Sequence, residues 1–61
     1  MPTVFLKSGG TATCVGYTVK DGVAKLIEVE FKDTAVPADK AKQPEAVVAL
    51  DNILYIIPDR P

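Results

Sequence analysis

Hydrophobic and polar residues alternate along the first half of this chain with the two-residue period of β-strands. The pattern predicts strands over Thr3–Lys7, Thr11–Lys20 and Val23–Lys32, which are rich in β-branched residues. Residues typical of turns separate them. Ser8-Gly9-Gly10 follows the first strand, and Asp21-Gly22, a strong two-residue hairpin signal, follows the second. The three strands are therefore expected to pair in an antiparallel meander.

The same alternation assigns side chains to the two faces of the sheet. In the third strand the expected core face carries Val23, Ile27, Val29 and Phe31, with Lys25 as an exception, and the solvated face carries Glu28, Glu30 and Lys32. In the second strand one face carries Val15, Tyr17 and Val19, and the other carries Ala12, Cys14, Gly16 and Thr18. A glycine at position 16, inside a strand, predicts a bend or a bulge.

The segment Ala46 to Ile57 breaks this alternation, since only Asp51 and Asn52 in it are polar. It reads as two strands, Ala46–Leu50 and Ile53–Ile57, joined by a tight turn. Both faces of these strands are hydrophobic, and a small domain has too little interior to cover them. Another copy of the chain is therefore expected to cover the second face or the strand edges. The expected oligomer interface consists of Val47, Val48, Ala49, Leu50, Ile53, Leu54, Tyr55 and Ile56.

Between the third and fourth strands lies a polar loop, Asp33–Glu45, which contains two prolines and in which Pro37 can begin one helical turn. Pro58 ends the last strand, and residues 59–61 form a tail. The fold class expected is all-β: one domain, residues 1–61, built as a five-stranded, strongly bent SH3-like or Sm-like small barrel without a long N-terminal helix.

Size and composition favour oligomerisation. A 61-residue domain is marginal on its own, and one cysteine with no histidine supplies neither an internal disulfide nor a common zinc site. The net charge of −1 is not that of a strong, non-specific nucleic-acid binder. No apolar run reaches the roughly 18 residues of a membrane span, and the N-terminus lacks a signal-peptide pattern. A cytoplasmic protein with no membrane partner is expected.

The candidate reactive residues do not form a catalytic set. Cys14 has no histidine to activate it, so a small buried hydrophobe is the simpler interpretation. Glu28 and Glu30 belong to a solvated strand face, where nothing raises a carboxyl pKa. The glycines of Ser8–Thr11 lack the spacing and the lysine of a phosphate loop. We therefore expect no enzyme activity, no cofactor and no metal.

Leu50-Asp-Asn-Ile-Leu-Tyr-Ile-Ile-Pro-Asp resembles the second signature of the Sm, LSm and Hfq-like family of small barrels. The N-terminal half is similar to the first signature at Val4, Leu6, Gly10, Gly16 and the run Asp21-x-x-Ala24-Lys25-Leu26. The resemblance implies a homo-oligomeric ring of about five to seven subunits, closed by cyclic symmetry. In such a ring the fourth strand of one subunit pairs with the fifth strand of the next.

The resemblance also implies RNA-binding positions at one mouth of the ring: Lys20, Lys25, Asp51 and Asn52. Lys25 stands where the family has asparagine, and Asp51-Asn52 stands where it has Arg-Gly or Lys-His. Two functions stay open. The first is a ring-forming Sm-like protein that binds RNA weakly or through an altered pocket. The second is a structural or protein-interaction barrel, of phage or mobile-element origin, with a protein partner and no nucleic-acid ligand.

Overall fold

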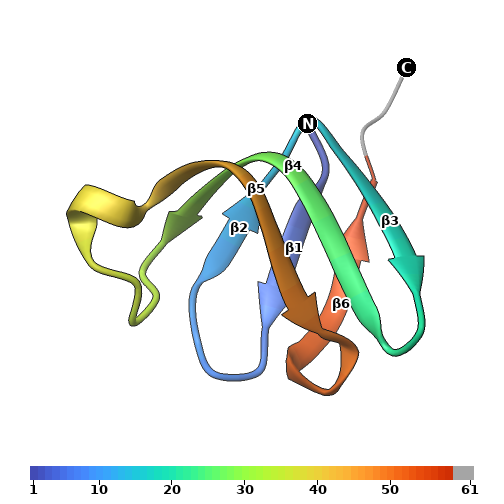
Figure 1. Cartoon of the computed structure of the whole chain (residues 1–61). Coiled ribbons are helices and arrows are strands. Elements are labelled where there is room, and N and C mark those ends of the chain that lie inside the picture. The colour runs from blue at the N-terminus through green and yellow to red at the C-terminus, as the bar shows by residue number, and fades with distance from the viewer. Residues whose placement is uncertain (59–61) are drawn as a thin grey trace.

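Antiparallel strands in meander order build one curled sheet (Figure 1). The computed structural model describes residues 1–58. Its strands are β1 (Thr3–Leu6), β2 (Thr11–Thr13), β3 (Gly16–Lys20), β4 (Val23–Lys32), β5 (Lys42–Ala49) and β6 (Ile53–Ile57). Two single-turn 3₁₀ helices, η1 (Ala38–Lys40) and η2 (Leu50–Asn52), lie in the connections on either side of β5. The predicted tail over residues 59–61 lies outside the described residues.

The pairing confirms the expected fold class, a small, strongly bent all-β barrel, here in the form of a half-barrel. β2 and β3 are the two halves of the long second strand that the sequence predicts. β1 pairs with β2 and β6, while β4 pairs with β2 and β3 along one edge and with β5 along the other. β5 and β6 are thus the two outer strands of the curl, and η2 joins them.

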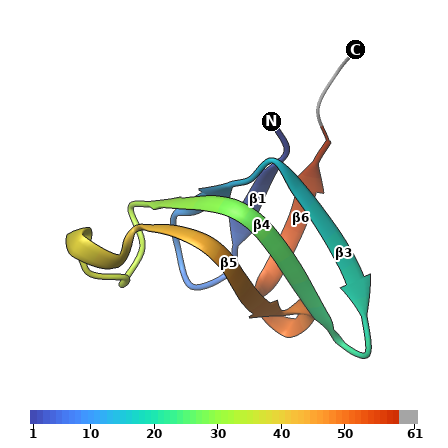
Figure 2. The same ribbon diagram turned by 45° about the horizontal axis from the view of Figure 1, so that its top comes forward.

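A crease across three neighbouring strands produces the curl. Each strand carries one residue beyond strict alternation: Val15 after β2, Glu28 in β4 and Pro44 in β5. The register places all three at one level, because Gly16 pairs with Ile27 and Thr13 with Glu30, while Ile27 pairs with Glu45 and Val29 with Gln43. Glu28 adopts φ 52°, a left-handed conformation unusual for a non-glycine residue in a strand. Figure 2 shows β4 and β5 bending together there.

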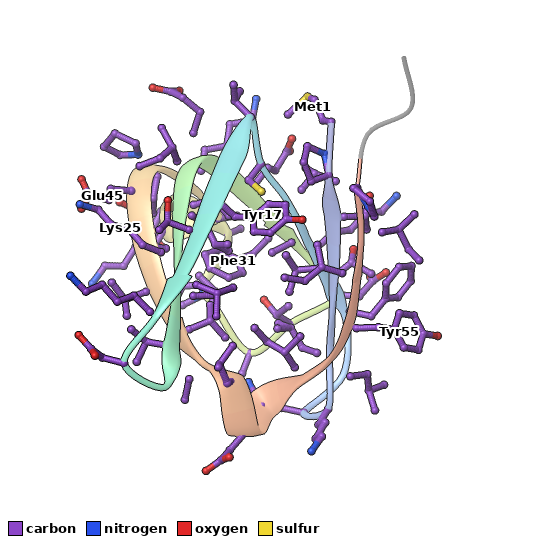
Figure 3. The ribbon with its side chains drawn as sticks, turned by 90° about the vertical axis from the view of Figure 1, so that its right-hand side faces the viewer. Met1, Tyr17, Lys25, Phe31, Glu45 and Tyr55 are labelled. Atoms are coloured by element: carbon purple, nitrogen blue, oxygen red, sulfur yellow. The ribbon has the colours of Figure 1, made fainter. Side chains whose placement is uncertain are left out.

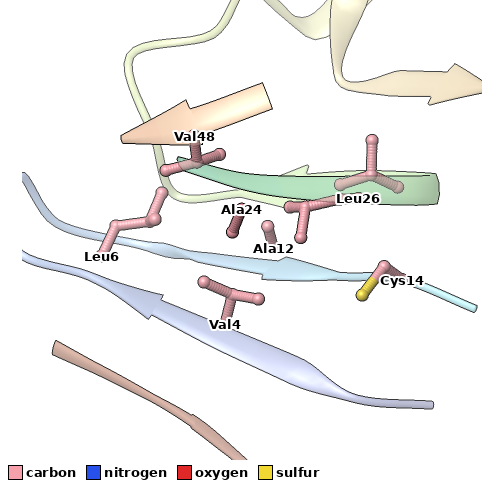
Figure 4. Close-up of a cluster of buried hydrophobic side chains, with 8 residues drawn as sticks. Val4, Leu6, Ala12, Cys14, Ala24, Leu26 and Val48 are labelled. Carbon is pink, nitrogen blue, oxygen red and sulfur yellow. The ribbon is translucent and has the colours of Figure 1, made fainter. Parts of the chain in front are cut away.

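The core lies on the concave side of the crease (Figure 4). It contains small and medium apolar side chains from every strand except β3 and β6: Val4, Leu6, Ala12, Cys14, Ala24, Leu26, Val29 and Val48. Phe31, Ala46, Leu50, Ile53 and Ile56 pack against this cluster while remaining partly exposed. No side chain larger than leucine is fully buried among the described residues, as the limited interior of so short a chain requires.

The crease corrects the predicted faces of the second and third strands. Ala24 and Leu26 are buried, not Val23 and Ile27, because the extra residue at Glu28 reverses the alternation before Val29 and Phe31. In the second strand Ala12 and Cys14 face the core, as do the register partners of Leu26 and Ala24, which are Tyr17 and Val19. The bend does fall beside Gly16, as predicted, but that glycine has no left-handed φ and open space around its Cα.

The local turn predictions fare better. Asp21 and Gly22 have φ values of 54° and 79°, so both central residues are left-handed, as a type I′ hairpin turn requires. A helical turn does follow Pro37. The start of the fourth strand was predicted too late, since β5 begins at Lys42 and includes Pro44. Proline is tolerated there because a position outside the regular ladder needs no N–H donor.

Candidate functional site

The four predicted RNA-binding residues do lie toward one end of the sheet, as the resemblance implies. The backbone N–H of Leu50, the first residue of η2, donates a hydrogen bond of 3.0 Å to the carbonyl of Gly22 in the β3–β4 turn. Both turns lie at the same end of the molecule in Figure 1. Lys20 and Lys25, near the hairpin, therefore share an end with Asp51 and Asn52 in η2. Their chemical environments, however, are unlike those of a phosphate-binding site.

Lys25 is engaged by a carboxylate. Its Nζ lies 3.0 Å from Oε1 of Glu45 on the neighbouring strand, and both side chains are about half exposed (Figure 3). The pair occupies the outer face of the sheet, where a hollow of about 380 Å³ is lined by Thr18, Lys20, Asp21, Val23, Lys25 and Val47. Asp21 and Glu45 match the two lysines in number, so this surface has no net positive charge with which to attract an anion.

Asn52 acts as a structural tie. Its Oδ1 accepts a hydrogen bond of 3.0 Å from the backbone N–H of Ser8, and its carbonyl accepts one of 2.7 Å from Lys7. These bonds hold η2 against the β1–β2 turn, which the sequence pattern does not reveal because the residues are 44 positions apart. Asp51 is exposed beside it. Of the four candidates, only Lys20 and Asp51 have no printed role in holding the fold.

The predicted oligomer interface divides into two sets. Val48, Leu50, Ile53 and Ile56 belong to the core or pack against it, so they are not available to another chain. Val47, Ala49, Leu54 and Tyr55 are exposed, with Val47 at 62% and Tyr55 at 56%. Half of the prediction thus identifies core residues, and the other half identifies an apolar surface along β5 and β6.

An irregularity in β6 exposes two successive residues. Phe5 pairs with Tyr55 and Leu6 pairs with Ile53, so Leu54 is an extra residue in the ladder. Leu54 and Tyr55, expected on opposite faces, are consequently both 56% exposed. Tyr55 points away from the barrel (Figure 3), with its ring centroid 5.0 Å from that of Phe5 and the rings tilted by 46°.

Ile57 extends this surface and is missing from the predicted interface. It is 51% exposed, and the alternation places it on the same outward face as Tyr55. Its position two residues after Tyr55 is a signal that could have identified it. The apolar surface of β5 and β6, which we call the edge surface, therefore consists of Val47, Leu54, Tyr55 and Ile57.

The backbone edges beside this surface are open. β5 pairs only with β4, and β6 pairs only with β1, within the described part of the chain. Each strand therefore directs alternate N–H and C=O groups away from the sheet, where a further strand can bond to them.

Cys14 is placed for packing. The thiol is fully buried, and Sγ lies 3.9 Å from the carbonyl of Pro2. Burial raises the pKa of this thiol, so it is protonated at neutral pH and is a poor nucleophile. Among residues 1–58 no group of three histidine, cysteine or acidic side chains is arranged to hold a metal ion. The same residues contain no helix with the length and hydrophobicity needed to cross a membrane.

Comparisons with protein-family models, curated proteins and solved structures find no match to this chain.

Proposed function

We propose that this protein is an assembly barrel of the kind the Sm-like resemblance implies, in which β5 of one copy pairs with β6 of the next to form a closed homo-oligomer. One observation carries the proposal. The edge surface lies on the two strands that end the sheet, and each of these strands has an unpaired backbone edge. Pairing them continues the sheet from copy to copy. It satisfies the open backbone groups and covers apolar side chains in one step.

The test compares three lysine substitutions of exposed apolar residues. Val47→Lys and Leu54→Lys place an ammonium group in the seam between copies, where its desolvation opposes association. Val15→Lys is the matched control, since Val15 is 63% exposed, against 62% for Val47, and lies on neither edge strand. By native mass spectrometry and sedimentation at micromolar concentration, the wild type and Val15→Lys should be multiples of the 6.5 kDa chain. The two edge variants should weaken association at least about tenfold, or about 1.4 kcal/mol.

A wild-type mass of a single chain would contradict the proposal. Equal dissociation by Val15→Lys would show instead that any added surface charge disperses the protein. The fold of each variant is checked by circular dichroism, because all three side chains are exposed and their replacement should leave the core intact.

RNA binding at the mouth of the assembly is a second candidate, supported by the shared end of Lys20, Lys25 and η2. Cyclic symmetry repeats these lysines in every copy, while Glu45 and Asp51 oppose an anion. Glu45→Gln and Asp51→Asn should therefore tighten binding of short U-rich or A-rich RNA, and Lys25→Ala should weaken it. Fluorescence anisotropy at two salt concentrations measures this, with a change of about one in the salt slope per phosphate contact. A wild type without saturable binding at low salt leaves the protein-scaffold function alone.

A further inference from the structure

We propose that the open edge of β3 binds an extended segment of another polypeptide as an added β-strand. β3 pairs with β4 along one edge, and none of the described strands pairs with its other edge. The β5 and β6 edges used in the proposed assembly do not include β3. This site is therefore separate from the seam between copies, and it does not depend on the assembly.

The backbone of β3 defines the class of ligand. The strand is five residues long, lacks proline, and has no charged side chain on its inner face, so it carries none of these common protections of an edge strand. In β5, by contrast, Pro44 interrupts the edge. Alternate residues of β3 direct N–H and C=O groups outward in the plane of the sheet. Another polypeptide strand, about 4.8 Å away, supplies donors and acceptors in the matching order.

The inner side chains of β3 determine what the added strand must carry on that face. Tyr17 and Val19 pair in register with Leu26 and Ala24, both completely buried, yet they are themselves 38% and 50% exposed. Figure 3 shows Tyr17 directed from β3 toward β1, on the concave side of the sheet. An added strand would cover these two residues from the open edge. Its inward residues are therefore expected to be apolar.

The outer side chains of β3 give the added strand a charge preference. Thr18 and Lys20 face outward from β3 itself, and the nearest outward neighbour on β4, Lys25, is paired with Glu45. Lys20 is thus the cation at the open edge, with Asp21 beyond it in the turn. Opposite charges on facing residues of paired strands are favourable. The expected ligand therefore alternates apolar residues with acidic ones.

A second copy of β3 fits this edge less well. Antiparallel pairing of two β3 strands about Thr18 sets Lys20 opposite Gly16, which leaves both lysines without an acidic partner. An acidic peptide compensates the charge, so the observations favour a different chain as the occupant.

The experiment uses two fluorescent peptides, one alternating valine with glutamate and the other alternating valine with lysine. The valine–glutamate peptide should bind the wild type saturably and at least tenfold more tightly than the valine–lysine peptide. Lys20→Glu should reverse this order, while Lys32→Glu, a matched charge reversal on the outer face of β4 away from β3, should not. Val19→Lys should weaken binding of the valine–glutamate peptide at least tenfold.

Hydrogen exchange locates the site. Added valine–glutamate peptide should slow exchange of amides in residues 16–20, both in the wild type and in Leu54→Lys, so that failure of the assembly does not imitate failure of this proposal. Absence of saturable binding, protection confined to β5 or β6, or a preference unaffected by Lys20→Glu would each overturn it. So would protection of residues 16–20 in the free protein that rises with concentration, because another copy would then occupy the edge.

Discussion

Two adjacent glycines in the β1–β2 turn face different constraints. Gly9 and Gly10 both have positive φ, at 106° and 82°, so each favours glycine. A Cβ added at Gly9 would meet open space, whereas one added at Gly10 would collide with the backbone of Lys32 and Asp33. Close approach of the turn to the end of β4 therefore requires glycine at position 10 for a second reason.

We predict that Gly10→Ala destabilises the fold more than Gly9→Ala. The backbone conformation alone should cost Gly9→Ala about 1 kcal/mol, and the added collision should bring Gly10→Ala to about 2 kcal/mol or more. Urea unfolding followed by circular dichroism measures both. Equal losses in the two variants would contradict the collision.

Individual residues were predictable where the chemistry is local. The left-handed Asp21-Gly22 turn follows from the two residues themselves, because few other pairs adopt that geometry without strain. Asn52 was not predictable in the same way. Its family position suggested a ligand contact, but its side-chain oxygen accepts from Ser8, and that partner is set by the tertiary fold.

At the scale of elements, Asn52 fastens the β5–β6 connection to the β1–β2 turn. Asn52→Ala leaves the N–H of Ser8 without this acceptor and should lower the free energy of unfolding by about 1 kcal/mol. Asn52→Asp keeps an acceptor oxygen and should lose less. Chemical denaturation distinguishes the two, and a loss in Asn52→Asp as large as in Asn52→Ala would show that the hydrogen bond contributes nothing.

The bounds of β4 and β6 follow from the sequence, whereas the faces of β4 do not. Apolar runs and flanking turns determine where a strand begins and ends. Which residues point inward depends on every position obeying a two-residue period, and Glu28, Val15 and Pro44 each break it. Glutamate at position 28 gives no local sign of a left-handed conformation, so the alternation predicted Ile27 inward where the structure buries Leu26.

At the scale of the molecule, the proposed assembly would make stability depend on concentration. Association favours the folded chain by mass action, so the melting temperature of the wild type should rise with protein concentration. In Leu54→Lys this dependence should largely disappear, while Val15→Lys should keep it. Differential scanning calorimetry over a range of concentrations measures the effect. A wild-type melting temperature that is constant over that range would contradict it.

The overall architecture was predictable because short turns join successive strands, and such strands pair as neighbours. The electrostatics of the candidate RNA site were not. The ion pair between Lys25 and Glu45 depends on the register of β4 with β5, and Glu45 was assigned to a loop. A sequence in which positions 25 and 45 read as unrelated thus conceals the neutralisation of one of its two candidate lysines.

The crease also limits how this chain can change length during evolution. Loss of one codon at Glu28 would leave Val29–Lys32 one step out of register with both flanking strands, because Val15 and Pro44 would keep their extra positions. Only simultaneous deletions in all three strands would restore the pairing, and the resulting sheet would be flat and would enclose less core. Relatives of this protein should therefore vary in length in the loop around η1, and keep constant spacing on both sides of residues 15, 28 and 44.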